Sequence, residues 1–153
     1  MINEIRRLST KVRDILDASK KSDHSPNSSL GLSDFPKGCC GDTSEVLQVI
    51  LHERLGISTT YKGMQHYHEN KDGLSMLNNG ASHAWLEFDG YIIDITADQF
   101  NEDGFNNDSV MVTTDKKFHK LFSDKNCSRV FDPNAEIKNS LYKTIKHVES
   151  KLE

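Results

Sequence analysis

The sequence predicts a single α+β domain in which a central helix packs against a small antiparallel sheet and terminal helices cover the outside. Three observations predict this class: amphipathic patterns at both ends of the chain, a mostly apolar helix between them, and a two-residue turn signal at Asp89-Gly90. The chain has 153 residues, of which 35% are hydrophobic and 27% are charged. That length supports one core and leaves no room for a second, so residues 1–153 are expected to form one domain.

Both ends of the chain carry apolar residues at helical spacing. The first pattern predicts a helix that ends near Ser19 and buries Ile2, Ile5, Leu8, Val12, Ile15 and Leu16. Toward the other end, Asp132-Pro133 combines a helix-capping residue with a proline suited to the first helical position. A second helical pattern follows it, formed by Ile137, Leu141, Ile145, Val148 and Leu152. Two amphipathic terminal helices are therefore expected.

The central helix is predicted from Thr43 to Leu55 and ends at Gly56, a residue typical of the position after a helix. Its apolar residues fit a mostly buried helix and are Val46, Leu47, Val49, Ile50, Leu51 and Leu55. Asp42 or Thr43 can cap its start. The residues after it, Ile57 to Met64, predict a strand.

A hairpin is predicted around Asp89-Gly90, because both central residues of a type I′ turn need positive φ. The turn separates the apolar runs Ala81 to Phe88 and Tyr91 to Ile95. Pairing Phe88 with Tyr91 sets the rest of the register: Glu87 with Ile92, Leu86 with Ile93, Trp85 with Asp94, Ala84 with Ile95 and His83 with Thr96. Alternation then places one set of side chains on an apolar core face, namely Ala84, Leu86, Phe88, Tyr91, Ile93 and Ile95.

The opposite face of the hairpin holds His83, Trp85, Glu87, Ile92, Asp94 and Thr96. On it, His83 and Asp94 are diagonal neighbours whose backbones are about 7–8 Å apart, a gap that two side chains can close. The sequence alone thus predicts an imidazole–carboxylate pair. Because His83 and Asp94 share one face of the hairpin, a catalytic role is more strongly expected for the pair than for either residue alone.

Three further segments are predicted to be loops, and Val110 to Thr113 is predicted to be a short strand. The predicted loops are Ser22 to Asp34, Tyr67 to Gly80 and Asn101 to Asp108, which are rich in polar residues and glycine. The basic stretch from Lys116 to Lys120 is interpreted as a solvated loop.

A candidate nucleophile stands at the start of the central helix. Cys40 lies at or just before the helix N-terminus, where unpaired N–H groups and the helix dipole favour a thiolate. The same N–H groups can stabilise an oxyanion. Gly38 and Gly41 flank the adjacent thiols of Cys39 and Cys40 and permit close approach of a substrate.

Three short motifs occur in order along the chain: Gly38-x-Cys40-x-Asp42, then His83-Ala84-Trp85, then Asp94-x-Thr96. Together they resemble the transglutaminase-like superfamily of papain-like cysteine enzymes, over a stretch from about Phe35 to Phe100. The resemblance implies a papain-like core and a catalytic triad of Cys40, His83 and Asp94, with Cys39 beside the nucleophile. No glutamine precedes Cys40 where papain-type enzymes place an oxyanion donor, so backbone donors are expected instead.

The implied activity is that of a cysteine hydrolase or acyltransferase that acts on a peptide or glutamine-type amide through a thioester. A protease, amidase or deamidase is favoured over a crosslinking transglutaminase, because water is always present. No cofactor or metal is expected. Besides the triad, the residues expected to line the site are Gly38, Cys39, Gly41, Asp42, Trp85 and Gln99.

Two alternatives remain open at this stage. One is a zinc site built from metal-ligand residue types, namely Cys39, Cys40, His66, His68, His83 and Asp94, although neither a CxxC nor an HExxH spacing occurs. The other is a binding module that keeps the fold without the chemistry.

The resemblance implies a protein or peptide substrate as the partner, and composition argues against two other classes of partner. The net charge of −4 argues against a nucleic-acid surface, and no apolar run is long enough for a membrane span. An odd number of cysteines, 3 in all, does not make a disulfide framework and suits a reducing compartment. A cytoplasmic protein is therefore expected, and the oligomeric state is left open.

Overall fold

The computed structural model describes residues 1–67 and 76–153, so His68 and most of the predicted Tyr67–Gly80 loop lie outside the described residues. Within that part of the chain the fold is α+β. The α-helices are α1 (Ile2–Ala18), α2 (Ser29–Leu32), α3 (Cys40–Leu55) and α4 (Tyr142–Leu152). The strands are β1 (Thr60–Gln65), β2 (Ser82–Phe88), β3 (Tyr91–Asp94), β4 (Met111–Thr113) and β5 (Asp124–Val130).

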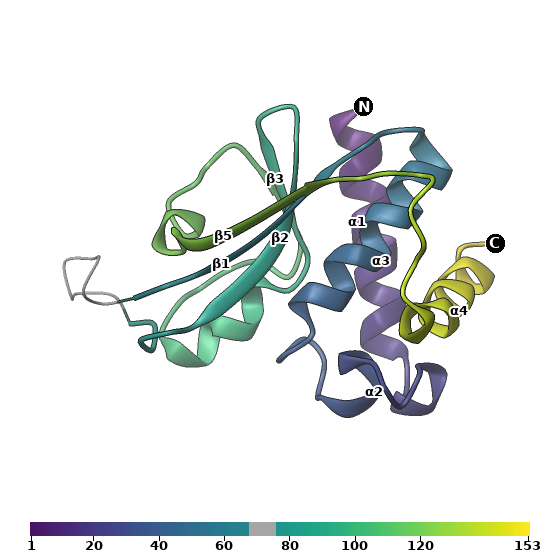
Figure 1. Cartoon of the computed structure of the whole chain (residues 1–153), viewed down its shortest axis with the longest axis horizontal. Coiled ribbons are helices and arrows are strands. Elements are labelled where there is room, and N and C mark those ends of the chain that lie inside the picture. Colours follow the sequence, from purple (N-terminus) through teal and green to yellow (C-terminus); the bar gives the residue numbers. More distant parts are fainter. Residues whose placement is uncertain (68–75) are drawn as a thin grey trace.

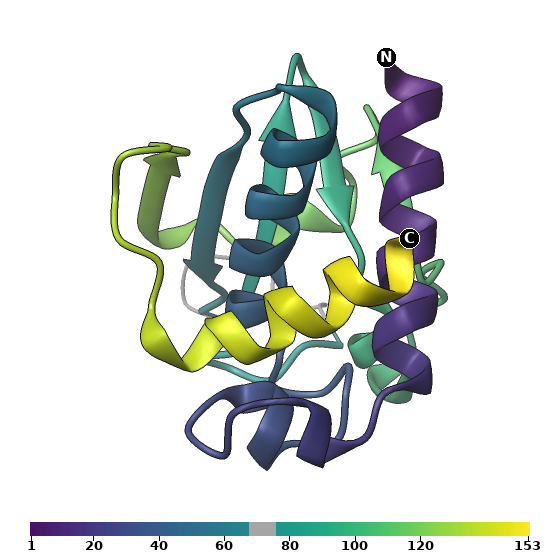
Figure 2. The ribbon, with the colours of Figure 1, turned by 90° about the vertical axis from the view of Figure 1, so that its right-hand side faces the viewer.

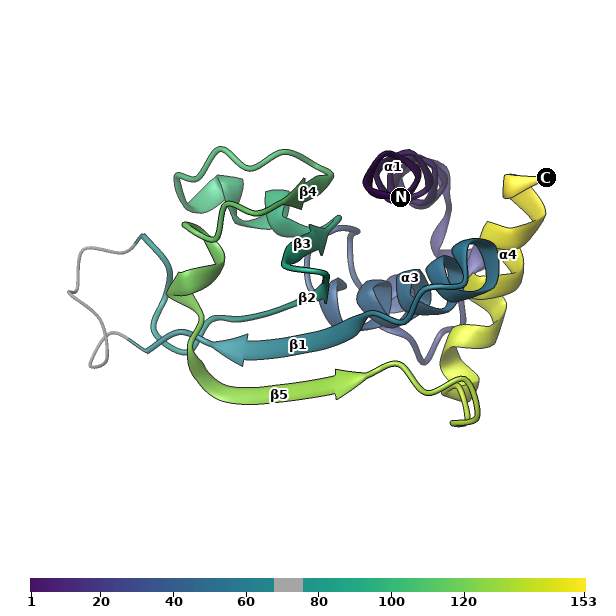
Figure 3. The same cartoon turned by 90° about the horizontal axis from the view of Figure 1, so that it is seen from above.

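The five strands form one antiparallel sheet in the order β4-β3-β2-β1-β5. The helices gather on one side of it, with α3 against β2 and with α1 and α4 beside α3 (Figure 1). Figure 2 shows α4 crossing in front of α3 toward α1, and Figure 3 shows α1 end-on above α3. None of the described helices has the combination of length and apolar character that a membrane crossing requires.

The predicted hairpin register is confirmed where the two strands pair. Leu86 lies opposite Ile93, Glu87 opposite Ile92 and Phe88 opposite Tyr91. Asp89 and Gly90 have φ angles of 50° and 79°, as a type I′ turn requires. The turn chemistry therefore determines which side chains of β2 and β3 face the helices.

Both faces of the β2–β3 hairpin are buried, whereas the sequence predicted a single core face for it. Leu86 and Ile93 belong to a core shared with the helices. Trp85 and Ile92, on the other face, belong to a second apolar cluster that also contains Leu77, Ala97, Phe100, Phe118 and Phe122. Aromatic residues from segments after β3 thus cover the face that carries His83 and Asp94.

Several element boundaries differ from the sequence prediction. Asp132 forms a turn by accepting a hydrogen bond from the Asn134 N–H at 2.9 Å, and helix α4 begins only at Tyr142. Asp42 does not cap α3. Its Oδ2 atom accepts hydrogen bonds from the backbone and hydroxyl of Ser29, which ties α2 to α3. Strand β5 was not predicted, because its exposed sequence lacks an apolar alternation.

Arg13 connects α1 to the segment that follows β3. Arg13 is 5% exposed, and its guanidinium donates to the Ile95 carbonyl at 2.7 Å and to both Asp98 carboxylate oxygens at 2.7 and 2.8 Å. The guanidinium also lies over the ring of Phe35, 5.0 Å from its centroid, and Phe35 belongs to the segment before the two thiols. One buried cation therefore holds together α1, the thiol segment and the segment after Asp94.

We expect Arg13→Met to lower the free energy of unfolding by about 3 kcal/mol, because it leaves Asp98 and a buried carbonyl without their donor. Urea titration followed by the fluorescence of Trp85, the single tryptophan, measures this. Lys37→Met is the matched control, since the Lys37–Glu102 ion pair is exposed. Equal stability losses in the two variants would contradict the role given to Arg13.

Candidate active site

The candidate nucleophile is the first residue of α3. Cys40 begins the helix, and its N-cap residue Cys39 provides no side-chain hydrogen bond to the amides of the first turn. Those amides have no intrahelical acceptor. Gly38, with φ of 68°, adopts a left-handed conformation that lets the chain turn into the helix at this point.

The thiol of Cys40 is close to the imidazole of His83. Burial by itself raises the pKa of the Cys40 thiol, but the interaction with the nearby, positively charged His83 outweighs burial and holds the pKa below its ordinary value of 9.0. A backbone hydrogen bond from Ala84 acts in the same direction. The geometry therefore favours a Cys40 thiolate.

Cys39 differs from Cys40 in environment although it is adjacent in sequence. Its side chain is buried, and its thiol donates to the Lys37 carbonyl at 3.3 Å and the Ser29 carbonyl at 3.5 Å. Burial raises the pKa of the Cys39 thiol to about 11. Cys39 is thus a structural thiol that fixes the turn before α3.

His83 is 1% exposed and its Nε2 atom lies 2.6 Å from Oδ2 of Asp94. Because an ionised carboxylate only accepts hydrogen bonds, Nε2 carries the hydrogen. The other ring nitrogen, Nδ1, is buried and has no hydrogen-bond partner among the described residues, so it is the ring atom left for the nearby Cys40 thiol. Burial lowers the pKa of His83, but the charge and hydrogen bond of Asp94, together with Cys40, raise the pKa to about 10. The predicted imidazole–carboxylate contact is confirmed.

Asp94 binds a second histidine that the sequence analysis did not single out. Nε2 of His119 lies 2.6 Å from the same Oδ2 atom, and His119 is 3% exposed. The other oxygen, Oδ1, accepts from the Thr96 N–H at 2.9 Å. Burial raises the pKa of Asp94, but the charge of His83 and the hydrogen bonds of both histidines hold it below 3.8.

His119 lies in the segment from Lys116 to Lys120 that was interpreted as a solvated loop. That prediction is wrong for Phe118 and His119, which are buried. A 3₁₀ helix, His119–Leu121, turns the lysines outward and the rings inward. The signal was present in the sequence, because Phe118, His119 and Phe122 lie on one face of a helical turn. Without the fold, nothing linked that face to Asp94.

Aromatic rings enclose the His83 imidazole. The ring centroids of Phe100, Phe122 and Trp85 lie 5.1, 5.5 and 5.6 Å from that of His83. The Trp85 indole is buried, and its N–H donates to Glu87 at 3.1 Å. These contacts shield the His83–Asp94 pair from water, which strengthens its electrostatic interaction.

Gln99 contacts the loop that carries the thiols. Its Oε1 atom accepts from the Gly38 N–H at 3.3 Å, which links the segment after Asp94 to the start of α3. Its Nε2 atom is buried and has no hydrogen-bond partner among the described residues. A buried amide donor is therefore present beside the thiol loop.

A cavity of about 350 Å³ opens onto the candidate nucleophile. Of the residues expected at the site, Cys40, Gly41 and His83 line it; Tyr61, Lys125, Cys127 and Arg129 line it as well and were not expected. The other lining residues are Gly63, Met64, Gln65, Ser82 and Ala84. The cavity lies between the start of α3 and the strands β1, β2 and β5.

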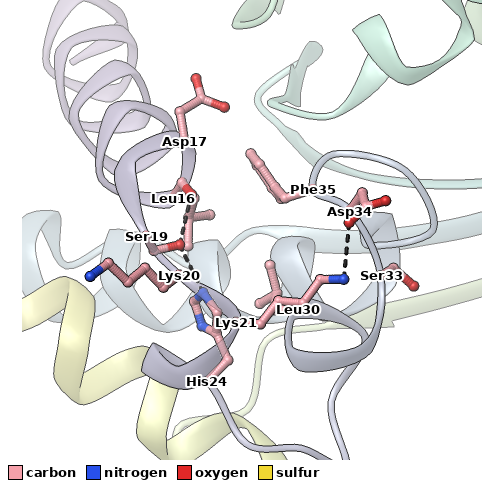
Figure 4. A pocket seen from close by; sticks show the side chains of 10 residues that line it. All are labelled: Leu16, Asp17, Ser19, Lys20, Lys21, His24, Leu30, Ser33, Asp34 and Phe35. Atoms are coloured by element: carbon pink, nitrogen blue, oxygen red, sulfur yellow. Dashed lines mark hydrogen bonds and ion pairs between the residues drawn. The ribbon is translucent and has the colours of Figure 1, made fainter.

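A separate pocket of about 210 Å³ lies at the end of α1 (Figure 4). Its buried histidine, His24, is already paired through Nε2 with Ser19 at 2.8 Å and through Nδ1 with Thr144 at 2.7 Å. Lys21 in the same pocket pairs with Asp34 at 3.0 Å. These groups support local structure, so the pocket beside Cys40 is the better candidate.

The three side chains His83, Asp94 and His119 are also of metal-ligand type and converge in the core. Their contacts fit hydrogen bonds better than ligation. Two ligands of one tetrahedral zinc ion, with bonds of about 2.0–2.1 Å, stand about 3.3 Å apart, whereas both N···O distances here are 2.6 Å. Of the other residues considered for zinc, Cys39 is bonded to carbonyls and His66 Nδ1 lies 2.7 Å from the Leu121 carbonyl.

We expect the stability of the protein to fall on both sides of mildly acidic pH because of this cluster. The lowered pKa of Asp94 contributes stability above the ordinary value of 3.8 that is lost as the pH falls. The raised pKa of His83 contributes stability below 6.5 that is lost as the pH rises toward about 10. Urea midpoints across pH measure both slopes.

Asp94→Asn is expected to flatten both slopes and to lower the free energy of unfolding by about 3 kcal/mol near pH 6. Asp108→Asn, at an exposed position, serves as the control. A pH profile of stability that is the same in Asp94→Asn as in the parent chain would refute the assignment of both shifts to this pair.

Comparison of the chain with protein-family models, with curated proteins and with solved structures finds no match in any of the three. The functional interpretation therefore depends on the geometry of the Cys40 site.

Proposed function

We propose that the protein is a cysteine hydrolase or acyltransferase with a transglutaminase-like, papain-like arrangement of Cys40, His83 and Asp94. The observation that carries the proposal is the position of Cys40 and His83 in one cavity, with Nε2 of the same imidazole 2.6 Å from Oδ2 of Asp94. A helix that presents the thiol and an antiparallel sheet that presents the base support a papain-like core.

The roles follow from the tautomer of His83. Asp94 holds the hydrogen on Nε2, which leaves Nδ1 to accept the proton of the Cys40 thiol. The thiolate then attacks the carbonyl carbon of an amide, and the carbonyl π electrons move onto oxygen. When the tetrahedral intermediate collapses, the C–N bond breaks and His83 gives its proton to the leaving amine. The product on the enzyme is a Cys40 thioester.

The oxyanion of the tetrahedral intermediate needs preorganised donors. In this proposal the backbone N–H groups at the start of α3 supply them beside Cys40. The unpaired Nε2 group of Gln99 is a candidate second donor, because its carbonyl oxygen is anchored to Gly38 in the same loop.

The second half of the reaction depends on the acceptor. Water, activated by His83, gives a protease, amidase or glutamine deamidase, whereas a primary amine gives transamidation. We favour water, because the cavity is open to solvent and no separate amine site is required. A peptide or protein is the proposed substrate.

The activity test combines a mixed peptide pool with a fluorescent primary amine, followed by mass spectrometry. Backbone cleavage, conversion of glutamine to glutamate and amine incorporation are three distinct mass changes, so one experiment separates the three chemistries.

We expect Cys40→Ala to abolish all product, a loss of at least about 10⁴-fold. The buried, high-pKa thiol of Cys39 makes Cys39→Ser the matched control, which retains activity. Activity that survives in Cys40→Ala and disappears in Cys39→Ser would reassign the nucleophile. No product from the parent chain would favour the binding-module alternative.

The activation of Cys40 can be tested without a substrate. We expect its rate of alkylation by iodoacetamide to rise to half its maximum at a lower pH than for an ordinary thiol, because His83 lowers the pKa of the Cys40 thiol. In His83→Ala the inflection moves to higher pH, since burial then acts on the thiol without a compensating charge. Mass spectrometry separates Cys40 from Cys127, the exposed third thiol. His147→Ala, at a partly exposed histidine of α4, is the control. An inflection of an ordinary thiol in the parent chain would disprove the proposed Cys–His pair.

A further inference from the structure

Strand β5 contains an irregularity where it passes the candidate active site. Gly63 of β1 pairs with Cys127 of β5, and Gln65 pairs with Asp124. Between these two pairs β1 advances by two residues and β5 by three, so β5 contains one extra residue. Lys125, within the extra stretch, has a φ of 53°. Positive φ is uncommon for a residue other than glycine, and bulges next to active sites redirect side chains.

The redirected strand places three side chains at the cavity of Cys40. Lys125, Cys127 and Arg129 occupy alternate positions of β5 and all line that cavity. Two of them are cations. The described lining residues include no aspartate or glutamate, although the whole chain has a net charge of −4. The mouth of the site is therefore positive in a protein that is negative overall.

The two cations are not equally available. The Arg129 guanidinium donates to Glu45 at 3.1 Å and lies 4.5 Å from the centroid of the Tyr61 ring. Lys125 makes no ion pair with any residue that the structure describes, and its ammonium lies 5.6 Å from the centroid of the Tyr67 ring. Lys125 thus contributes the main uncompensated charge, and Arg129 a partly neutralised one. One net charge suits a carboxylate better than a doubly charged phosphate.

We propose that the acyl group attacked by Cys40 carries a carboxylate, and that Lys125 binds this carboxylate with Arg129 as the second cation. The proposal rests on the function proposed above, because it names the substrate class of the same thiol. Such substrates include peptides with an acidic side chain on the acyl side of the scissile amide. The strained bulge at Lys125 is then the structural feature that selects the substrate.

Iodoacetate and iodoacetamide form a matched pair of probes for this proposal. Each transfers a two-carbon group to sulfur and releases iodide, and the two differ in presenting a carboxylate or a neutral amide. The ratio of their rates at Cys40, measured within one variant by mass spectrometry, cancels changes in thiol reactivity. The charge on His83 favours iodoacetate in every variant, so the informative quantity is the change in the ratio.

We expect Lys125→Gln to lower the iodoacetate-to-iodoacetamide ratio about fivefold, the upper range for a solvent-exposed ion pair. Arg129→Gln lowers it less, because Glu45 already shares that cation. Lys125→Arg retains the ratio of the parent chain. Lys62→Gln is the matched control, since Lys62 lies on the adjacent strand β1 but does not line the cavity. Added salt reduces the preference of the parent chain for iodoacetate.

Two results would overturn the inference. In the first, the ratio is unchanged in both Lys125→Gln and Arg129→Gln. In the second, Lys62→Gln lowers the ratio as much as Lys125→Gln. That result would indicate a general electrostatic effect of surface cations and no specific carboxylate site. The pH profile with iodoacetamide alone tests the proposed function separately, because an ordinary thiol profile would reject the activated nucleophile whatever the ratio shows.

Discussion

The buried carboxylate of Asp94 is the constraint on which the arrangement of the site depends. A charged group that is 2% exposed must find hydrogen-bond donors inside the protein, because burial without them costs several kcal/mol. Asp94 finds its donors in His83, His119 and the Thr96 backbone, which come from β2, from a 3₁₀ helix before β5 and from its own turn. The hydrogen bonds of His83 and His119 to one oxygen, Oδ2 of Asp94, therefore bring together segments that are far apart in the sequence. The first of these bonds also fixes the tautomer of the histidine beside Cys40.

The thiol reaches this cluster by a different route. Helix α3 is buried along most of its length and packs on β2. Its first residue, Cys40, therefore lies near His83 of β2, and both residues line the same cavity. The loop before it is held by Ser29, Gln99 and the Phe35 ring, which stacks on Arg13. Arg13 also binds the Ile95 carbonyl, directly after the Asp94 strand. One buried cation thus limits how far the Cys40 thiol and the Asp94 carboxylate can move relative to each other.

Local chemistry made part of this architecture predictable from sequence. The Asp89-Gly90 turn determined the register of the hairpin, and alternation then placed His83 and Asp94 on one face, as the structure has them. What could not be predicted depended on contacts between distant segments. His119 lies among lysines, and only its contact with Asp94 makes it informative. Strand β5 has an exposed, charged sequence and is ordered by pairing with β1. Asp132-Pro133 carries a helix-start signal, yet the chain makes a single turn there and α4 begins at Tyr142.

The enclosure of His83 also determines from which side another molecule can reach Cys40. Phe100, Phe122 and Trp85 pack around the imidazole on the side of the second apolar cluster, and α3 covers the opposite face of β2. The cavity that reaches Cys40 is bordered instead by β1 and β5. A substrate that approaches the thiol through it must pass Tyr61 on β1 and the cations of β5. The strand that sequence alone did not predict therefore borders the approach to the candidate nucleophile, and its cations lie on the path of any molecule that reaches the thiol through this cavity.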